Sequence, residues 1–161
     1  MSDEFGNEIL SATLDASDKV ALPLIKKWEG LHRVGRDGLV YPYRDPAGYP
    51  TIGYGTLLRS MDVQPITQDM AFTLLYIKYV EAKWQVLQSS PHLAGDPKRL
   101  AAITSFVYNL GIGRYRASTL KKKVDSQDWV AARREIQRWV YAGGRKLNGL
   151  IARRKEEAEL L

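Results

Sequence analysis

The alternation of apolar and polar positions divides the chain into a helix, a turn-rich segment and a long helical region. From about residue 18, apolar side chains recur at helical spacing on one side, as Leu22, Ile25 and Trp28. Gly30 is placed to end this helix. Gly and Pro then punctuate residues 31–55, with short β-favouring runs between them, which predicts a small antiparallel sheet with tight turns.

After Pro65 the pattern is helical to the end of the chain, and polar residues mark where helices begin. Thr67 predicts the start of a long helix, Asp96 the next, and Ser118 a short basic one. Another helix is expected from about residue 125 to the Gly143–Gly144 pair, and a last one from about residue 147. The apolar residues expected to face inward on two of these helices are Met70, Leu74, Leu75, Trp84 and Leu87, then Trp129, Ile136, Trp139 and Val140.

These elements predict an α+β fold in a single domain, which suits a chain of 161 residues. Residues 1–18 show no clear period and hold five acidic residues, so we expect an N-terminal extension there. Residues 19–161 would form the domain, with a sheet lobe over about 30–60 and a helical lobe over about 65–161.

The composition limits the kinds of functional site and partner that the chain can have. There are no cysteines, and the two histidines, His32 and His92, lie far apart and are expected at the surface, so no metal site is indicated. The net charge of +6 is uneven: residues 1–80 carry 8 Lys+Arg against 10 Asp+Glu, and residues 81–161 carry 16 against 8. A basic half favours a polyanionic partner, or simply keeps the surface soluble. No apolar run approaches a membrane span, and the acidic start does not resemble a signal peptide.

Glu29 stands out because it lies at the end of the first predicted helix. The negative end of the helix macrodipole disfavours a charged carboxylate, and burial beside Trp28 would favour the protonated form further. A carboxylic acid held protonated near neutral pH is a general acid. The alternative is an exposed Glu that merely ends an amphipathic helix.

A second set of candidates lies in the segment YRDPAGYPTIGYG, residues 43–55. Asp45 precedes a proline, a pair that starts turns, and Thr51 opens a strand in which Gly53 and Gly55 alternate. Glycines there would leave one strand face bare, so that a ligand could approach the backbone. Tyrosine rings, which suit stacking against sugars, crowd the region at positions 41, 43, 49 and 54.

An acid on a helix that faces a carboxylate on a hairpin is the arrangement of glycoside hydrolysis. One carboxyl group protonates the leaving oxygen, and the other activates a water molecule or attacks the sugar. A hydroxyl nearby can hold the water in line. We therefore predict that Glu29, Asp45 and Thr51 are catalytic; taken singly, Asp45 is also an ordinary turn residue and Thr51 an ordinary strand residue.

Four segments, in order, resemble the phage-type lysozymes, glycoside hydrolase family twenty-four. They are Glu29-Gly30-Leu31 with YRDPAGYPTIGYGTLL, then SFVYNLGIGRYRASTL at 105–120, the region of Trp139, and GLIARRKEEAEL at 149–160. The resemblance covers roughly residues 20–161, and the ordered set is far more specific than a Glu-Gly pair alone. It implies a lysozyme-like fold, with the active cleft between a small antiparallel sheet lobe and a larger helical lobe.

The resemblance also implies an activity. Such proteins are phage endolysins, muramidases that hydrolyse the β-1,4 bond between N-acetylmuramic acid and N-acetylglucosamine in peptidoglycan and so lyse the host cell. By motif, Glu29 matches the acid, Asp45 the base of an inverting mechanism and Thr51 the third catalytic position. No cofactor or metal is implied. Substrate contacts are expected from Tyr43, Tyr49, Leu57, Tyr108, Asn109 and Ser118; helix packing and capping are the alternative for the helical positions.

The sequence departs from the compact members of the family between Glu29 and Asp45, with extra residues around Val34–Tyr41. Asp37 is therefore a rival for the second carboxylate, at a spacing closer to theirs. It lacks the surrounding Tyr, Gly and Thr, so we prefer Asp45 and expect Asp37 and Gly38 at the tip of an inserted hairpin. The insertion would lengthen the lip of the cleft.

The doublet Arg153-Arg154 lies in the last matching segment. By the resemblance, one of these arginines pairs with Glu29, which would favour the charged carboxylate and oppose the effect of the helix end. The alternative is a solvated helix face in which the doublet pairs with the glutamates three and four positions on.

The family resemblance and the uneven charge also predict the binding partners. We expect a monomer that binds peptidoglycan glycan strands, with an anionic outer-membrane surface as a secondary partner of the basic C-terminal helices, and no nucleic acid. The protein would accumulate in the host cytoplasm, leave through a holin-type pore and act in the periplasm on the cell wall.

Two other functions stay open. A lytic transglycosylase would cleave the same bond without water, and would not need Asp45 or Thr51. A non-enzymatic basic protein that binds membranes or nucleic acid would use the charge of LKKKV and of the final helix, and would not need Glu29.

Overall fold

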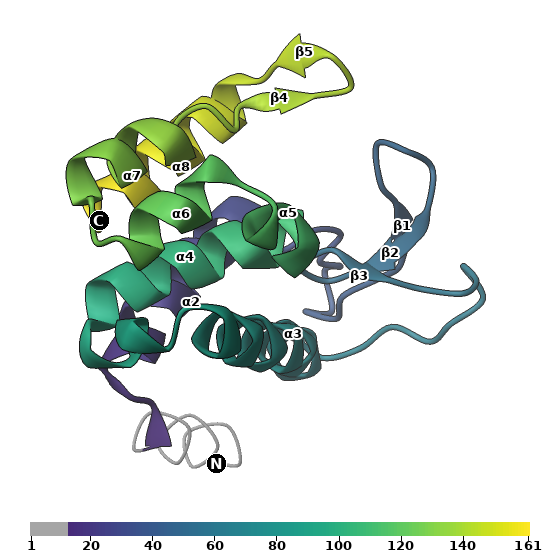
Figure 1. The fold of residues 1–161 in the computed structure, drawn as a ribbon. Coiled ribbons are helices and arrows are strands. Elements are labelled where there is room, and N and C mark those ends of the chain that lie inside the picture. Colours follow the sequence, from purple (N-terminus) through teal and green to yellow (C-terminus); the bar gives the residue numbers. More distant parts are fainter. Residues whose placement is uncertain (1–12) are drawn as a thin grey trace.

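The structure is a computed structural model that describes residues 13–161, and it has a helical lobe beside a smaller sheet-bearing lobe (Figure 1). This confirms the expected α+β class. The part of the expected extension over residues 1–12 lies outside the described residues. Within residues 13–161, no helix has both the length and the apolar run that crossing a membrane requires.

The first described helix, α2 (Ala16–Glu29), begins slightly earlier than predicted because Asp15 caps it. Oδ1 of Asp15 accepts hydrogen bonds from the N–H groups of Ser17 and Asp18, and the side chain of Asp18 accepts one from the N–H of Asp15. Gly30 ends the helix as predicted, with φ of 67°. Glu29 is thereby fixed as the last residue of α2.

The sheet lobe contains three short antiparallel strands in the order β1 (Tyr43–Arg44), β2 (Pro50–Ile52) and β3 (Thr56–Leu57). The register places Tyr43 opposite Thr51, and Thr51 opposite Leu57. Directly opposed residues on neighbouring strands point to the same face of a sheet. Three of the predicted site residues therefore share one face.

Gly53 and Gly55 correct one expectation. They do not alternate within a strand but lie in the tight turn between β2 and β3, with φ of 65° and 90°. Only glycine adopts such angles readily. Their role is therefore to close the turn.

The insertion before the sheet forms the expected hairpin tip. Val34 pairs with Val40 in an antiparallel bridge, and Gly38 has φ of 79°. Asp37 is used locally, because it accepts hydrogen bonds from the N–H of Leu39 and the hydroxyl of Tyr41. This local bonding gives the Asp37 carboxylate a structural function in the turn.

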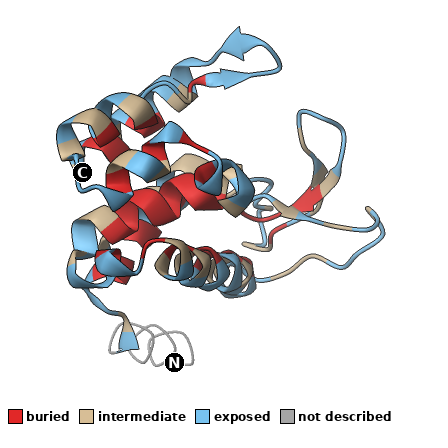
Figure 2. Cartoon of the chain, in the orientation of Figure 1, coloured by how far each residue is buried: buried red, intermediate tan, exposed pale blue. Residues whose placement is uncertain are grey.

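The helical lobe contains α3 (Gln68–Ser89), the 3-10 helix η1 (Pro91–Gly95), α4 (Pro97–Leu110), α5 (Ile112–Arg116), α6 (Thr119–Asp125), α7 (Trp129–Ile136) and α8 (Asn148–Glu159). Thr67, Asp96 and Ser118 cap α3, α4 and α6 as predicted. α4 is the centre of the lobe: every residue from 100 to 108 is buried (Figure 2), and the helix packs against α2, α3, α5 and α8. The core is thus built around α4.

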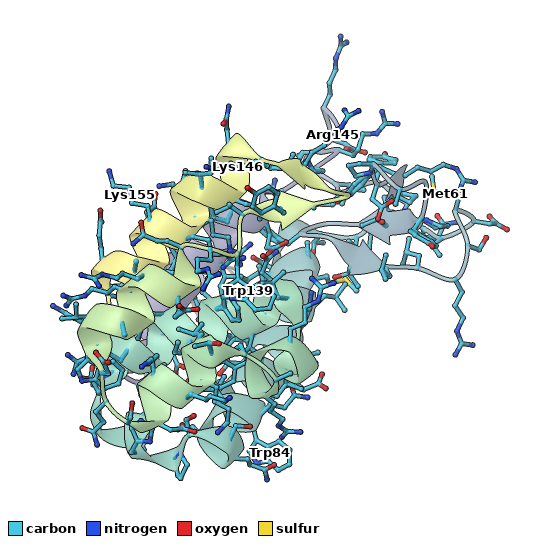
Figure 3. All side chains as sticks on the ribbon, turned by 45° about the horizontal axis from the view of Figure 1, so that its top comes forward. Met61, Trp84, Trp139, Arg145, Lys146 and Lys155 are labelled. Carbon is cyan, nitrogen blue, oxygen red and sulfur yellow. The ribbon has the colours of Figure 1, made fainter. Side chains whose placement is uncertain are left out.

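Two helical predictions are wrong in part. On α3, Met70 and Trp84 do not face inward; they are 55% and 59% exposed, and Figure 3 shows Trp84 at the outer edge of the lobe. Leu75 is buried as predicted, and the rest of the inward face is Ala71, Tyr79, Ala82 and Val86. The apolar residues on both sides of this helix made its inward face ambiguous.

The helix expected to reach Gly143 ends at Ile136. The chain then forms a hairpin of β4 (Tyr141–Ala142) and β5 (Arg145–Lys146), which extends from the helical lobe on the side of the sheet lobe (Figure 1). Gly143 and Gly144 have φ of 55° and 74°. Two successive residues with positive φ form the two-residue turn that joins antiparallel strands, and not a helix end.

Candidate active site

Glu29 lies where the two lobes meet. Its Oε1 accepts a hydrogen bond of 2.8 Å from Nη1 of Arg153 on α8, and its side chain is 20% exposed. A Cβ atom built on Gly55 would lie 3.7 Å from Oε2 of Glu29, so the β2–β3 turn passes directly beside this carboxylate. The carboxylate therefore has a fixed partner on one side and the sheet lobe on the other.

Arg153 is buried, and other residues hold it in place. Its Nε donates to Oε1 of Glu157 at 3.2 Å, and its Nη2 donates to the carbonyl of Ser105 at 3.2 Å. Arg154 is also buried; it donates to the carbonyl of Trp139 and, like Arg153, to Glu157. The alternative is therefore wrong about solvation, because the doublet is buried, but both arginines do pair with the glutamate three or four positions on.

Asp45 forms the turn between β1 and β2. Its Oδ1 accepts hydrogen bonds from the N–H groups of Ala47 and Tyr49, at 2.9 and 2.8 Å. Within residues 13–161, no group donates a hydrogen bond to Oδ2. One oxygen thus orders the turn, and the other is available to a water molecule or ligand.

Thr51 is 1% exposed on the middle strand. Its hydroxyl donates a hydrogen bond of 2.9 Å to the carbonyl of Tyr49. The hydroxyl hydrogen is used by the backbone just before the strand, which leaves the oxygen of Thr51 as an acceptor.

Tyr43 is subject to the charges of both carboxylates. Burial raises the pKa of Tyr43, and the negative charges of Asp45 and Glu29 raise it further. Its ring centroid lies 5.2 Å from that of His32, whose Nε2 is 3.1 Å from the backbone oxygen of Glu29. The charges of Glu29 and Asp45 therefore act on the same tyrosine.

The helical lobe faces Glu29 with Tyr108 on α4 and Lys78 on α3. Burial raises the pKa of Tyr108 above its usual range, and the charge of Glu29 raises it further against the opposing charge of Arg153. Nζ of Lys78 lies 4.2 Å from the Tyr108 ring centroid, and partial desolvation lowers the pKa of this lysine, although the residue as a whole is exposed and Glu29 opposes the change. The predicted substrate position Tyr108 is thus close enough to sense the charge of Glu29.

The other predicted substrate positions differ in exposure. Tyr49 and Leu57 are 61% and 66% exposed on the sheet lobe. Asn109 accepts a hydrogen bond from Arg154, and Ser118 caps α6 while donating to the carbonyl of Tyr115. Asn109 and Ser118 therefore have structural partners of their own, and Ser118 also lines a pocket with Trp139.

Sequence reasoning did not select Ser105, Glu157, Lys78 or His32. Ser105 and Glu157 lie within the matched segments, but nothing in their local pattern distinguishes a buried ion pair from an exposed helix face.

Among the described residues, no group of three or more His, Asp and Glu side chains is arranged to hold a metal ion. The functional groups of this region are carboxylates, hydroxyls, tyrosines and basic side chains.

Comparison with known proteins identifies the family. The sequence model of the phage lysozyme family matches residues 26–157. The chain belongs to the phage lysozyme family. It is 31% identical to a SAR-endolysin of Bacteriophage PS119 over 166 aligned residues, which cover 99% of this chain and 95% of that protein.

Solved structures agree with this assignment. An endolysin from Escherichia coli O157:H7 phage FAHEc1 superposes with a TM-score of 0.70 at 29% identity, covering 92% of this chain and 93% of that one. The muramidase domain of SpmX from Asticaccaulis excentricus gives a TM-score of 0.73 at 25% identity, covering 87% of this chain and 92% of that one. The expected lysozyme-like fold and phage lysozyme function are confirmed.

Proposed function

We propose that this phage lysozyme hydrolyses the β-1,4 bond between N-acetylmuramic acid and N-acetylglucosamine in peptidoglycan, with Glu29 as the general acid. The observation that carries the proposal is the position of Glu29: it ends α2, bonds to buried Arg153, and lies beside the β2–β3 turn, which follows Thr51 in the same sheet whose β1–β2 turn bears Asp45. A carboxyl group so placed can donate a proton to a glycosidic oxygen bound between the lobes.

Asp45 and Thr51 activate and orient the water molecule that attacks the sugar. Oδ2 of Asp45, which has no donor among the described residues, accepts the proton of the attacking water. The oxygen of Thr51 accepts a hydrogen bond from the same water and holds it in line. This division implies inversion at the sugar, for which the two carboxyl groups stand ~6.5–9.5 Å apart and leave room for the water.

The sugar chain would lie along the exposed face of the sheet lobe. Tyr49 and Leu57 offer exposed apolar surface there, and Tyr43 is half-buried on the neighbouring strand β1. Tyrosine rings suit sugar faces because they combine an apolar face with a polar edge. Tyr108 would line the helical side of the cleft. Asn109 and Ser118 would stabilise the helices on that side.

The expected site of action is the cell wall, in the periplasm, in keeping with the endolysin relatives. The excess of Lys and Arg after residue 80 complements an anionic envelope. Accumulation in the cytoplasm, release through a holin-type pore, monomeric action and contact with the outer-membrane surface remain part of the proposal.

The proposal is tested by clearing of outer-membrane-stripped bacteria with wild type, Glu29→Gln and Asp45→Asn. Both variants should lose a hundredfold or more in rate, on the order of what a general acid or base contributes (~10²–10⁴-fold). Asp37→Asn is the matched control, because it removes a carboxylate of the inserted hairpin tip and should leave the rate near wild type. Circular dichroism would check that each variant is folded; full activity of Glu29→Gln would refute the assignment.

A further inference from the structure

Glu157 is a buried carboxylate on α8 whose two oxygens bond to different groups. Oε1 accepts hydrogen bonds from the hydroxyl of Ser105, at 2.7 Å, and from Nε of Arg153, at 3.2 Å. Oε2 accepts from Nη1 of Arg154. The side chain is 0% exposed, so it is shielded from solvent.

The positive charges of the arginines beside Glu157 are fully neutralised only when the carboxylate of Glu29 is counted as well. Arg153 and Arg154 are both buried and carry two positive charges, against the single negative charge of Glu157. The carboxylate of Glu29 supplies the second negative charge, through Nη1 of Arg153. A buried charge is costly unless it is paired. Glu157 neutralises part of the positive charge of the two arginines, and Glu29 neutralises what remains on Arg153.

The geometry of Arg153 depends on the same residue. Its guanidinium is planar, so fixing Nε and Nη2 also fixes where Nη1 points. Nε is fixed by Glu157, and Nη2 by the carbonyl of Ser105. Nη1 then meets Oε1 of Glu29 at 2.8 Å.

We propose that Glu157 is a positioning residue for Glu29, because it holds Arg153 against Glu29 and neutralises part of the charge of that arginine. The inference rests on the proposed role of Glu29 as general acid. Glu157 itself contacts neither substrate nor the reacting atoms.

Other charged and titratable groups also face Glu29, from every neighbouring element. Lys78 comes from α3, Tyr108 from α4, Tyr43 from β1, and the ring of His32 contacts the backbone oxygen of Glu29. Within residues 13–161, Arg153 alone bonds to the carboxylate of Glu29. Removing the negative charge behind Arg153 should therefore change the protonation of Glu29 while leaving these other groups in place.

The test is the pH profile of kcat/KM on purified peptidoglycan for Glu157→Gln. Without the negative charge, Arg153 acts more strongly on Glu29, so protonated Glu29 is lost at lower pH. The alkaline limb of the profile should move down by about one pH unit, the size expected for one nearby charge at a partly buried site. A loss of stability alone would lower the amount of active enzyme without moving this limb.

Glu156→Gln is the matched control. It removes a carboxylate from the neighbouring position of α8, where Glu156 bonds to Lys27 and Trp28 and does not contact Arg153. Its alkaline limb should coincide with that of wild type. An equal shift in both variants would show a general charge effect and overturn the inference.

Thermal unfolding would establish whether Glu157→Gln is folded at the assay temperature. If it is not, the profile is recorded at a lower temperature at which the variant is folded. An unshifted limb in the folded variant, or failure of Glu157→Gln to fold at any temperature, would assign Glu157 to stability alone. Glu29→Gln separates the two claims: activity there refutes the proposed function, whereas an inactive Glu29→Gln with an unshifted Glu157→Gln refutes only this inference.

Discussion

Tyr79 and Asp18 tie the first described helix to the long helix through one buried contact. The hydroxyl of Tyr79 donates to Oδ1 of Asp18 at 2.6 Å, and Nζ of Lys83 reaches the same oxygen at 2.7 Å. Asp18 also completes the cap of α2 with Asp15. The contact therefore anchors the N-terminal end of the helix that carries Glu29 at its other end.

Replacing Tyr79 with Phe should lower the free energy of unfolding by about 1–3 kcal/mol, because Asp18 loses a buried donor and keeps only Lys83 and the cap. Urea denaturation measures the change. Tyr76→Phe is the control: the neighbouring tyrosine is partly buried and its hydroxyl bonds to no described residue, so its loss should be small. Equal effects of the two substitutions would contradict this account of the contact.

At this scale, the residues chosen from sequence were those with unusual local chemistry. Glu29 at a helix end and Asp45 before a proline could be selected because their positions are disfavoured or special. Glu157 could not, because in ARRKEEAEL it reads as one more glutamate of a charged helix. Its burial depends on the packing of α8 against α4, which a helical period does not reveal.

At the scale of the elements, the ends of helices were easier to predict than their lengths or their buried faces. Capping residues and terminal glycines act locally, and so Thr67, Asp96, Ser118 and Gly30 marked real helix ends. The stop at Gly143 was instead a hairpin turn. The face of α3 was misjudged because apolar residues lie on both of its sides: Met70 and Trp84 are exposed, whereas Tyr79 and Val86 are buried.

The turn between β2 and β3 gives a prediction for the sheet lobe. Gly53 has φ of 65°, and a Cβ built there would lie 3.0 Å from Cβ of Ala71 on α3. Gly53→Ala should therefore cost more stability than the ~1–2 kcal/mol of a left-handed alanine, because it adds a close contact in the interior. The effect would be measured by urea denaturation.

Gly38→Ala provides the comparison. Gly38 also has positive φ, at 79°, but no atom lies within 4 Å of a Cβ built there. It should show the backbone cost alone. If Gly38→Ala were as destabilising as Gly53→Ala, packing of the turn against α3 would not be the cause.

For the molecule as a whole, buried tyrosines set the alkaline limit of stability. Burial raises the pKa of Tyr79, Tyr108 and Tyr115 above the usual range, and neighbouring carboxylates raise it further. In the unfolded chain each tyrosine loses its proton near pH ~10. A raised pKa in the folded state contributes stability that is complete below that pH and is lost as pH rises above it.

The melting temperature should accordingly stay level on the alkaline side of neutrality and fall once the pH exceeds ~10. Thermal unfolding followed by circular dichroism at a series of pH values measures this. In Tyr115→Phe the decline should be shallower, since one titrating group is removed. A melting temperature that is constant through pH ~11 would contradict the prediction.

The central claim is that a proton from Glu29 and a water activated by Asp45 together cleave the glycan. The most direct measurement is mass spectrometry of the fragments released from purified peptidoglycan in ¹⁸O-labelled water, for wild type and Glu29→Gln. Wild type should release fragments whose new reducing end is N-acetylmuramic acid carrying one ¹⁸O atom, and Glu29→Gln should release almost none. Unlabelled anhydro-sugar ends from wild type, or labelled ends released at full rate by Glu29→Gln, would contradict the account.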